Sequence, residues 1–502
     1  MTPFLVFLPR PARLVPAGLA ALTTLAACEP TLDATPTPTA GSADFSRYIS
    51  VGNSLTAGFE DNGLYREGQL NSYPSMLAQQ FALAGGGKFV QPLFTESQAN
   101  GNGYLRLTGF SPTGSPVLTT VTDNLALRGT DTSAQGVALL TRFTDPINNL
   151  GVPGLRMSQI EDTRLGNPTS TSGPFNPLFE RLQPEGVTNQ PYLARVAASD
   201  PTFFTCWLGN NDVLGYATSG GAIASLQPDS YSLTSVGSFT TRAGKLIDAL
   251  TTNPNTKGVV GLIPNVTAIP FFTTVGATVK AQLAGLGETQ LVATTGEFLL
   301  TAGSPPITRK TIDAADIKAG TSGRQLFTLT GGGYVPLIGA ARGKYWLDFY
   351  NQVAPGLAKA GLNVTWTDFV TVLQLDTTQR FGLSAANPWP TTLLLDDEEQ
   401  VSVQQATTAF NAAMRTKAES KGLAVFDAYS FFDRISAEGI ATSGVSNTTS
   451  YISGNLFSLD GVHPSPRGYS LIANELLRII NAKYGATLPL VDPGQYRGVR
   501  LP

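Results

Sequence analysis

The chain has 502 residues, with 42% hydrophobic and 14% charged residues and a formal net charge of −3. Such a composition, with 52 Gly and 34 Pro, is that of a loop-rich globular chain, and its length suggests roughly two to four domains or one domain with long insertions. No cluster of Lys and Arg occurs, which argues against nucleic-acid binding. One histidine and two cysteines exclude a disulfide framework and a Cys- or His-based metal centre.

The first 27 residues have the pattern of a signal peptide. Arg10 and Arg13 precede an apolar stretch from Leu14 to Ala27, which is too short for a bilayer because spanning takes about 20 residues. The stretch ends in Leu25-Ala26-Ala27-Cys28, which resembles the lipobox of bacterial lipoproteins. The resemblance implies cleavage before Cys28, lipidation of its thiol, and attachment to a membrane of the bacterial cell envelope, at the outer membrane or cell surface. An ordinary secretory signal that happens to contain Cys28 is the alternative.

Residues 28–45 are rich in Pro and Thr and have little to bury, which predicts a flexible tether after this anchor. Loss of the first 27 residues removes two arginines and no acid, so the formal charge becomes −5. Because Cys28 has another use, Cys206 has no disulfide partner. It lies in an apolar stretch and is predicted to be a buried, inert thiol.

The run Tyr48–Val51 is a short predicted strand that leads into Gly52-Asn53-Ser54, and a helix is expected from Tyr73 to Ala84. A strand, a glycine-flanked turn and a helix place Ser54 at the carboxyl end of a sheet, where open α/β folds have their sites. A plain turn is the alternative for this motif alone.

A second motif follows an insertion of loops and short strands at about residues 95–140. Asn149 is followed five positions later by Gly154, and Gly151 lies between them. Glycine lets a backbone N–H approach a substrate closely, and Gly154 is the first choice for that role, with Gly151 the second. A simple Gly/Pro turn would explain the same residues.

Strands and helices then alternate, which predicts a parallel sheet. The apolar strand Thr202–Leu208 runs into Gly209-Asn210-Asn211-Asp212, and Ser238–Leu250 and Thr256–Ile263 are the next helix and strand. Residues of about 266–392 do not continue this alternation. They form either an insertion packed on the core or a cap that shapes a substrate pocket.

The last motif contains His463, the only histidine of the chain, and Asp460 three positions before it. It follows a helix expected from Asp396 to about Lys421 and a strand at Leu423–Asp427. On one tight loop, the Asp460 carboxylate can accept a bond from the Nδ1–H of His463, which leaves Nε2 free to take a proton. A capped helix start explains Ser465 onward but not this pair.

The motifs Gly-Asn-Ser-Leu, Asn-x-x-x-x-Gly, Gly-x-Asn-Asp and Asp-x-x-His together resemble the blocks of the SGNH (GDSL) hydrolase family, in the family's order. The resemblance implies an α/β fold, a flavodoxin-like three-layer α/β/α sandwich with a parallel central sheet and large loop and β-rich insertions, without metal or cofactor. We expect the domain at residues 46–485 and a C-terminal tail at 486–502. The family's roles fall on Ser54 as nucleophile, Asp460 and His463 as its partners, Asp212 as a structural residue, and Ser54, Gly154 and Asn211 as the oxyanion hole.

The resemblance implies a serine ester hydrolase that acts through an acyl-enzyme on Ser54. Asn53 departs from the family, which usually has Asp there, and it keeps the carbonyl oxygen but loses the charge. An inactive lipoprotein that binds a glycan, a lipid or a partner, and an acyltransferase, are the alternatives. Lipids, acetylated glycans and small esters remain open as substrates.

Overall fold

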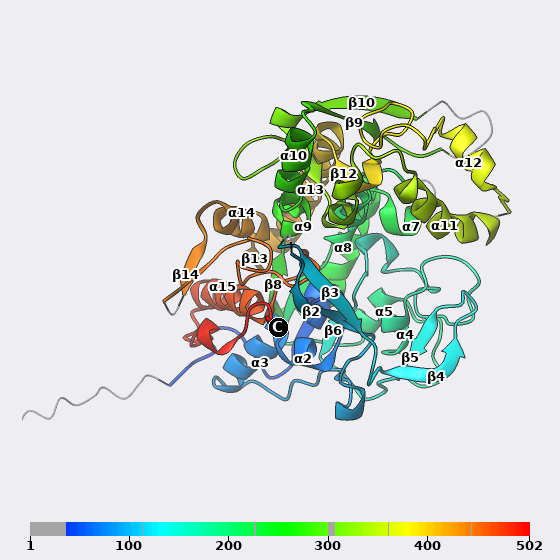
Figure 1. Ribbon diagram of the computed structural model, residues 1–502. Helices are drawn as coiled ribbons and strands as arrows, with labels where there is room; N and C mark the ends of the chain where they lie inside the picture. Colours follow the sequence, from blue (N-terminus) through cyan, green and yellow to red (C-terminus); the bar gives the residue numbers. More distant parts are fainter. Residues whose placement is uncertain (1–36, 113, 225–226, 300–306, 360, 443) are drawn as a thin grey trace, which may run out of the picture. The chain divides into compact units, whose positions relative to one another are not determined.

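The central sheet has five parallel strands, and β1 (Tyr48–Gly52) lies between two neighbours (Figure 1). In this computed structural model, residues 37–502 are described except 113, 225–226, 300–306, 360 and 443. The strand order across the sheet is β6-β1-β7-β8-β13. With these five strands numbered in chain order, this is 2-1-3-4-5, the flavodoxin-like order. The predicted α/β class and parallel sheet are confirmed. The other four strands are β6 (Asn149–Gly151), β7 (Phe203–Trp207), β8 (Lys257–Gly261) and β13 (Ala424–Phe426).

Every residue of β1 and of β7 is buried, which explains why both strands appear in the sequence as short apolar runs without alternation. In the register of the sheet, Gly52 pairs with Gly151 on one side and with Trp207 on the other. A Cβ on Gly52 would lie 2.4 Å from the Trp207 carbonyl oxygen, so a larger residue does not fit. The carboxyl ends of β1, β6 and β7 therefore meet at one edge of the sheet.

The long helices begin at side-chain caps, of which the sequence predicted the one at Ser465. Ser465 accepts a hydrogen bond from the Gly468 N–H, and Asp396 accepts from the Glu398 and Glu399 N–H groups. Of these helices, α15 packs against α3, and α8 packs against both α5 and α13. Their bounds are α3 (Tyr73–Ala82), α5 (Tyr192–Ala197), α8 (Val236–Leu250), α13 (Asp397–Ser420) and α15 (Pro466–Tyr484).

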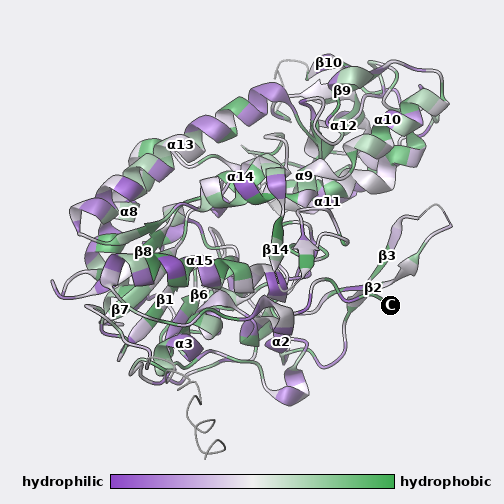
Figure 2. Ribbon diagram, turned by 90° about the vertical axis from the view of Figure 1, so that its left-hand side faces the viewer, coloured by the Kyte–Doolittle hydropathy of each residue, from purple (hydrophilic) through white to green (hydrophobic). Residues whose placement is uncertain are grey.

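The first insertion, where loops and short strands were expected, contains two β-hairpins. β2 (Tyr104–Phe110) pairs with β3 (Pro116–Val121), and β4 (Leu127–Thr132) pairs with β5 (Ala138–Leu140). Figure 2 shows the β2–β3 hairpin as an arm that projects from the body of the protein.

The second insertion has a hydrophobic core of its own, which contains Trp346, Phe369 and Trp389. It is built on the antiparallel pair β9 (Gln290–Thr295) and β10 (Thr308–Asp313). Because this insertion packs around its own core, the alternation of strands and helices that forms the parallel sheet does not continue through it. Its other elements are α9 (Pro270–Thr273), α10 (Gly276–Gly285), β11 (Leu326–Phe327), α11 (Lys344–Lys359), α12 (Trp366–Val372) and β12 (Leu394–Leu395).

The packed part of the chain extends from Pro38 to Pro502, beyond the limits of 46 and 485 expected from the sequence. Phe45 before the first limit and Val491 after the second are buried in the main core. The predicted signal peptide, Cys28 and the first half of the tether lie outside the described residues. Within the described part, no helix has both the length and the apolar composition needed to cross a membrane. The short elements are α1 (Ser54–Ala57), α2 (Arg66–Leu70), α4 (Pro177–Glu180), α6 (Asn211–Thr218), α7 (Pro228–Tyr231), α14 (Ala428–Glu438), β14 (Ile440–Thr442) and β15 (Val445–Asn447).

Candidate active site

Ser54 is the first residue of α1, directly after the turn that ends β1. The Asn53 side-chain oxygen caps this helix by accepting from the Leu55 N–H at 3.2 Å. Only 6% of Ser54 is exposed. The turn therefore holds the serine at the carboxyl edge of the sheet, as the sequence predicted.

The structure brings Ser54, His463 and Asp460 together. His463 Nε2 lies 2.8 Å from Ser54 Oγ, although 409 positions separate the two residues. His463 Nδ1 lies 2.9 Å from Asp460 Oδ2. A hydroxyl, an imidazole and a carboxylate in this order allow the ring to accept the serine proton while the carboxylate fixes the tautomer.

Asp460 is held as an anion by five hydrogen bonds. Oδ2 accepts from the His463 ring and from the Asn62 N–H at 2.9 Å. Oδ1 accepts from the Ser458 hydroxyl at 3.0 Å and from the Val462 and His463 N–H groups, each at 2.8 Å. Burial alone would raise its pKa, but the His463 charge and these bonds outweigh burial and lower the pKa to about 2. Asp460 is therefore ionised at neutral pH.

A turn at Asp61 and Asn62 is hydrogen-bonded to the loop that carries Asp460 and His463. The sequence analysis did not include this turn in the site. Its residues have positive φ angles of 52° and 60°. The Asp61 N–H donates to Ser458 Oγ at 2.9 Å, and the Asp61 carboxylate accepts from the Leu459 N–H at 2.9 Å. Asp-Asn-Gly at residues 61–63 is a strong turn signal that could have located the turn, but nothing local shows that it contacts residues almost 400 positions away.

A buried acidic cluster lies beside this turn. The Tyr65 hydroxyl donates to Glu60 Oε1 at 2.5 Å and to Asp61 Oδ2 at 3.0 Å, and Arg497 from the C-terminal segment lies 3.1 Å from Glu60. Burial raises the pKa of Glu60 to about 8, and the charges of Asp61 and Glu67 add to this rise, while Arg497 and Tyr65 oppose it. Burial also raises the pKa of Asp61. The C-terminal segment thus contributes to the support of the triad.

Gly154 follows β6 with a φ of 79°, a conformation that favours glycine. Its N–H has no acceptor among the described residues, whereas the Gly151 N–H donates to Asn149 Oδ1 at 2.9 Å. Asn176, which the sequence did not single out, donates to the Pro153 carbonyl at 2.8 Å and holds this turn. Gly154 is therefore the better donor candidate of the two glycines.

Asn211 and Asp212 join the turn after β7 to the turn after β6. The Asn211 amide donates one hydrogen to the Leu155 carbonyl at 2.9 Å, which leaves the second available. Asp212 is buried and accepts from the Met157 N–H at 2.6 Å and the Ser158 N–H at 3.1 Å. Burial raises its pKa, against which Arg156 and these bonds act. The contacts fit a structural role for Asp212.

The structure also shows the surroundings of Asn53 and Cys206, two residues that the sequence analysis singled out. The Asn53 Nδ2 is buried without a hydrogen-bond partner among the described residues, which is the cost of an amide where the family usually has a carboxylate. Cys206 is a free, buried thiol, and burial raises its pKa to about 12, so it remains protonated. No group of three or more His, Cys, Asp or Glu side chains suited to a metal ion occurs among the residues described.

A comparison with family models found a match. The model of the GDSL-like Lipase/Acylhydrolase family matches residues 355–476, which include Asp460 and His463. The match supports membership of the chain in the SGNH/GDSL hydrolase family. The matched segment starts after Ser54, and no curated protein matches the chain. The match supports a hydrolase of the esterase type in general.

Proposed function

We propose that this SGNH hydrolase cleaves carboxylic esters through an acyl-enzyme on Ser54. The proposal depends above all on the continuous line of hydrogen bonds from Ser54 Oγ through His463 to Asp460, with distances of 2.8 and 2.9 Å. A buried hydroxyl in contact with an imidazole that a carboxylate orients is an arrangement for nucleophilic catalysis.

In the first half of the reaction, Ser54 Oγ attacks the ester carbonyl carbon while its proton moves to His463 Nε2. The C–O bond to the alcohol then breaks, and His463 gives that proton to the leaving oxygen. In the second half, His463 takes a proton from water, which attacks the acyl carbonyl. The carboxylic acid leaves, and the proton returns to Ser54. Asp460 stabilises the imidazolium that forms in each half, because its low pKa keeps it charged.

Negative charge on the carbonyl oxygen requires donors in place before the reaction. We assign this role to the N–H groups of Ser54 and Gly154 and to the Asn211 amide. Support comes from the sheet, because β1, β6 and β7 are neighbours and their following turns share one edge. The Asn211–Leu155 bond ties two of these turns together. Loss of one such donor typically lowers turnover on the order of 10²–10³.

A three-layer α/β/α arrangement of the fold is part of the proposal. The chain moves from β1 to β6 in one direction across the sheet and then through β7 and β8 to β13 in the other. Because crossovers between parallel strands are right-handed, this reversal assigns the connecting helices to opposite faces. The packing of α15 on α3, and of α13 on α8, agrees with two separate helical layers.

Attachment to a membrane through a lipidated Cys28 is likewise a proposal. It rests on the Leu-Ala-Ala-Cys pattern at residues 25–28 and the Pro/Thr-rich stretch after it. Mass spectrometry of the N-terminal peptide from native cells tests it, because a diacylglyceryl group on Cys28 adds a defined mass. A peptide that starts elsewhere, or that has an unmodified thiol, would exclude the anchor.

Hydrolysis of p-nitrophenyl acetate tests the enzymatic proposal. We expect the wild-type protein to release p-nitrophenolate and Ser54→Ala to fall to the uncatalysed rate. Ser470→Ala is the matched control, because Ser470 is also buried but, among the residues described, bonds only to the Arg467 carbonyl of its own helix. Equal rates for wild type and Ser54→Ala would refute the nucleophile.

A second measurement separates the alternatives. A fluorophosphonate probe should label Ser54 in the wild type and nothing in Ser54→Ala, as read by peptide mass spectrometry. A protein that neither hydrolyses the ester nor takes the label would be a binding protein. Formation of a new ester when butanol is added would instead identify an acyltransferase.

A further inference from the structure

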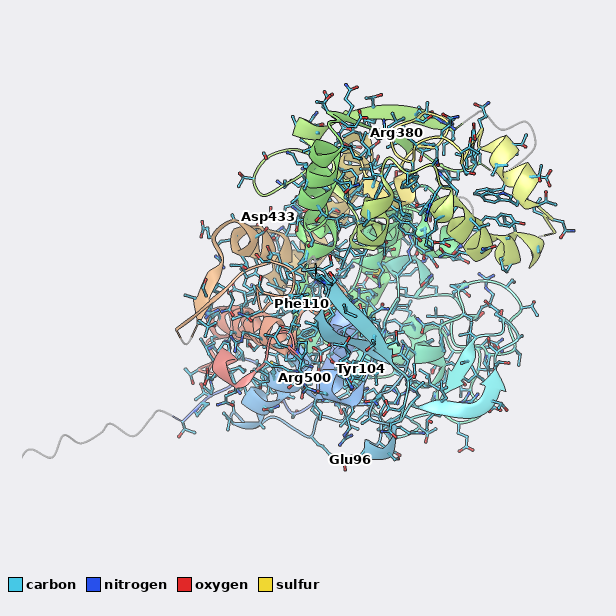
Figure 3. The ribbon with its side chains drawn as sticks, viewed as in Figure 1. Glu96, Tyr104, Phe110, Arg380, Asp433 and Arg500 are labelled. Carbon is cyan, nitrogen blue, oxygen red and sulfur yellow. The ribbon has the colours of Figure 1, made fainter. Side chains whose placement is uncertain are left out.

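A cleft of about 940 Å³ lies outside the parallel sheet. Three segments form its walls: the β2–β3 hairpin, the second insertion, and the stretch of chain between β13 and the triad loop. Phe110, Thr321 and Tyr451 represent the three segments in the lining. Figure 3 labels Phe110 on the hairpin and Asp433, another lining residue, on α14.

Each of these segments is hydrogen-bonded to the triad loop or to the turn that supports it. At the base of the hairpin, the Leu105 N–H donates to the Asp61 carbonyl at 2.7 Å. From the second insertion, the Phe271 N–H donates to the Gly461 carbonyl at 2.9 Å. The Tyr451 hydroxyl donates to the Leu459 carbonyl at 2.7 Å. The walls of the cleft are therefore tied to the loop that carries Asp460 and His463, while neither of these two residues is in its lining.

The lining of the cleft is suited to a ligand with many hydroxyl groups. An alkyl chain would strip water from the hydroxyls of the lining without replacing their hydrogen bonds, which is unfavourable. A polyhydroxylated ligand both donates to and accepts from such groups. Lys318 and Asp433 add one charge of each sign. The hydroxyl-bearing lining residues include Thr321, Ser436, Thr449 and Ser450, and also Thr273 and Thr274, whose hydroxyls already donate to backbone carbonyls.

An aromatic side chain stands at the rim of this cleft, whose lining combines hydroxyl groups with apolar surface. Phe110 is 52% exposed, although it is among the largest apolar side chains of the protein. Its ring offers the apolar face against which the C–H surface of a sugar ring packs, while the neighbouring hydroxyls meet the sugar's polar edge. An aromatic face beside hydroxyl groups fits a carbohydrate better than a purely apolar ligand.

One wall of the cleft holds an unusual backbone. Ile452, a lining residue, has a φ of 64°, which is an outlier for a β-branched side chain. Such conformations persist only where the surroundings enforce them, and they cluster at ligand sites. Here a hydrogen bond from the Gly454 N–H to the Ser450 carbonyl at 2.9 Å closes the turn. The wall is thus held in a shape that its own sequence disfavours.

We propose that this cleft binds the alcohol part of the substrate and that this part is a carbohydrate. As a statement about the substrate, the inference rests on the proposed ester hydrolysis. As a statement about binding, it can be tested without catalysis.

The test uses calorimetric titration of the full-length Ser54→Ala protein with an acetylated xylotetraose. Thr321 and Thr449 line the cleft, and their hydroxyls make no hydrogen bond among the described residues. Replacing each by valine keeps the shape and removes the hydroxyl. We expect the double variant Thr321→Val/Thr449→Val, made in the same background, to bind about tenfold more weakly, since each lost hydrogen bond contributes modestly. Thr119→Val, at an exposed position of β3 outside the lining, is the matched control and should bind as before.

Activity measurements then separate the two proposals. In the protein with Ser54 intact, the double variant should lose about tenfold in kcat/KM on the acetylated xylotetraose and nothing on p-nitrophenyl acetate. No binding of the sugar by Ser54→Ala, or equal affinity in the double variant, would overturn the cleft assignment even if p-nitrophenyl acetate is hydrolysed. Sugar binding without any hydrolysis would keep the cleft and refute the esterase. Faster hydrolysis of p-nitrophenyl palmitate than of the sugar ester would also contradict a carbohydrate site.

Discussion

The Ser458 hydroxyl donates a hydrogen bond of 3.0 Å to the Asp460 carboxylate. The Ser458 hydroxyl oxygen also accepts a hydrogen bond from the Asp61 N–H at 2.9 Å. Ser458 therefore joins the turn at Asp61, which has a left-handed backbone conformation, to the triad. Both hydrogen bonds of the Ser458 hydroxyl thus serve to hold Asp460 in place. Ser458 is therefore a positioning residue, which sets the orientation of Asp460 and, through it, of His463.

Replacement of Ser458 by alanine should lower kcat about tenfold and leave KM unchanged, because a bond to a carboxylate contributes about 1.5–3 kcal/mol and Asp460 retains four others. Steady-state kinetics with p-nitrophenyl acetate measures the effect. Ser470→Ala serves as the control for loss of a buried hydroxyl elsewhere on the core. A change in KM alone, or the same loss in both variants, would contradict a positioning role.

Ser54 and His463 should act as a unit. Each single replacement by alanine should lower kcat by on the order of 10⁴ or more, and the double variant should be no worse than the worse single variant. The reason is that His463 accepts the proton of Ser54. Without His463 the serine has no base, and without Ser54 the base has no nucleophile to activate. Additive losses, measured as kcat on p-nitrophenyl acetate, would show two independent functions and exclude the proposed mechanism.

The parts of this site that follow single strands could be predicted from the sequence. Ser54 and Asn211 each come directly after an apolar run, and His463 is the chain's only histidine, so position and chemistry point to the same residues. The support of Asp460 by Asp61 and Ser458 depends on contacts between distant segments, which no local pattern contains. The second insertion packs its own core, and its pattern of short strands and helices gave no sign of where it would contact the triad loop.

The pKa of Glu60 makes a pH-dependent prediction about stability. Burial raises this pKa from 4.5 to about 8. Between these two values the unfolded chain has lost the proton and the folded chain still holds it, so the free energy of unfolding falls as pH rises from 4.5 to 8. Glutamine at position 60 is neutral at every pH in this range. It should therefore remove the contribution of Glu60 to the fall in the free energy of unfolding. The Tm of Glu60→Gln relative to wild type should therefore increase steadily across that range.

Thermal unfolding at pH 4.5, 6 and 8 measures this difference. Glu438→Gln, on the exposed end of α14, gives the baseline for removing a carboxylate. A Tm difference for Glu60→Gln that is constant with pH, or that shrinks as pH rises, would mean that Glu60 is ionised in the folded protein and that Arg497 outweighs its burial.

Gly154 allows strain and function to be separated. Alanine there must adopt a φ near 79°, which costs roughly 1–2 kcal/mol. It does not clash, because the nearest atom to an added Cβ is Asn176 Nδ2 at 3.6 Å. If the Gly154 N–H holds the oxyanion, the backbone shift that relieves this strain should also lower kcat, by on the order of 10²–10³ for a lost donor.

Gly186 provides the matched control, because its φ is 74° and a Cβ there would meet no atom within 4 Å. Gly154→Ala and Gly186→Ala should lower Tm by similar amounts, since both place alanine in the left-handed region without a clash. Only Gly154→Ala should lose turnover, measured with p-nitrophenyl acetate. Full activity in Gly154→Ala, with the loss of Tm present, would assign the oxyanion to the Ser54 N–H and the Asn211 amide alone.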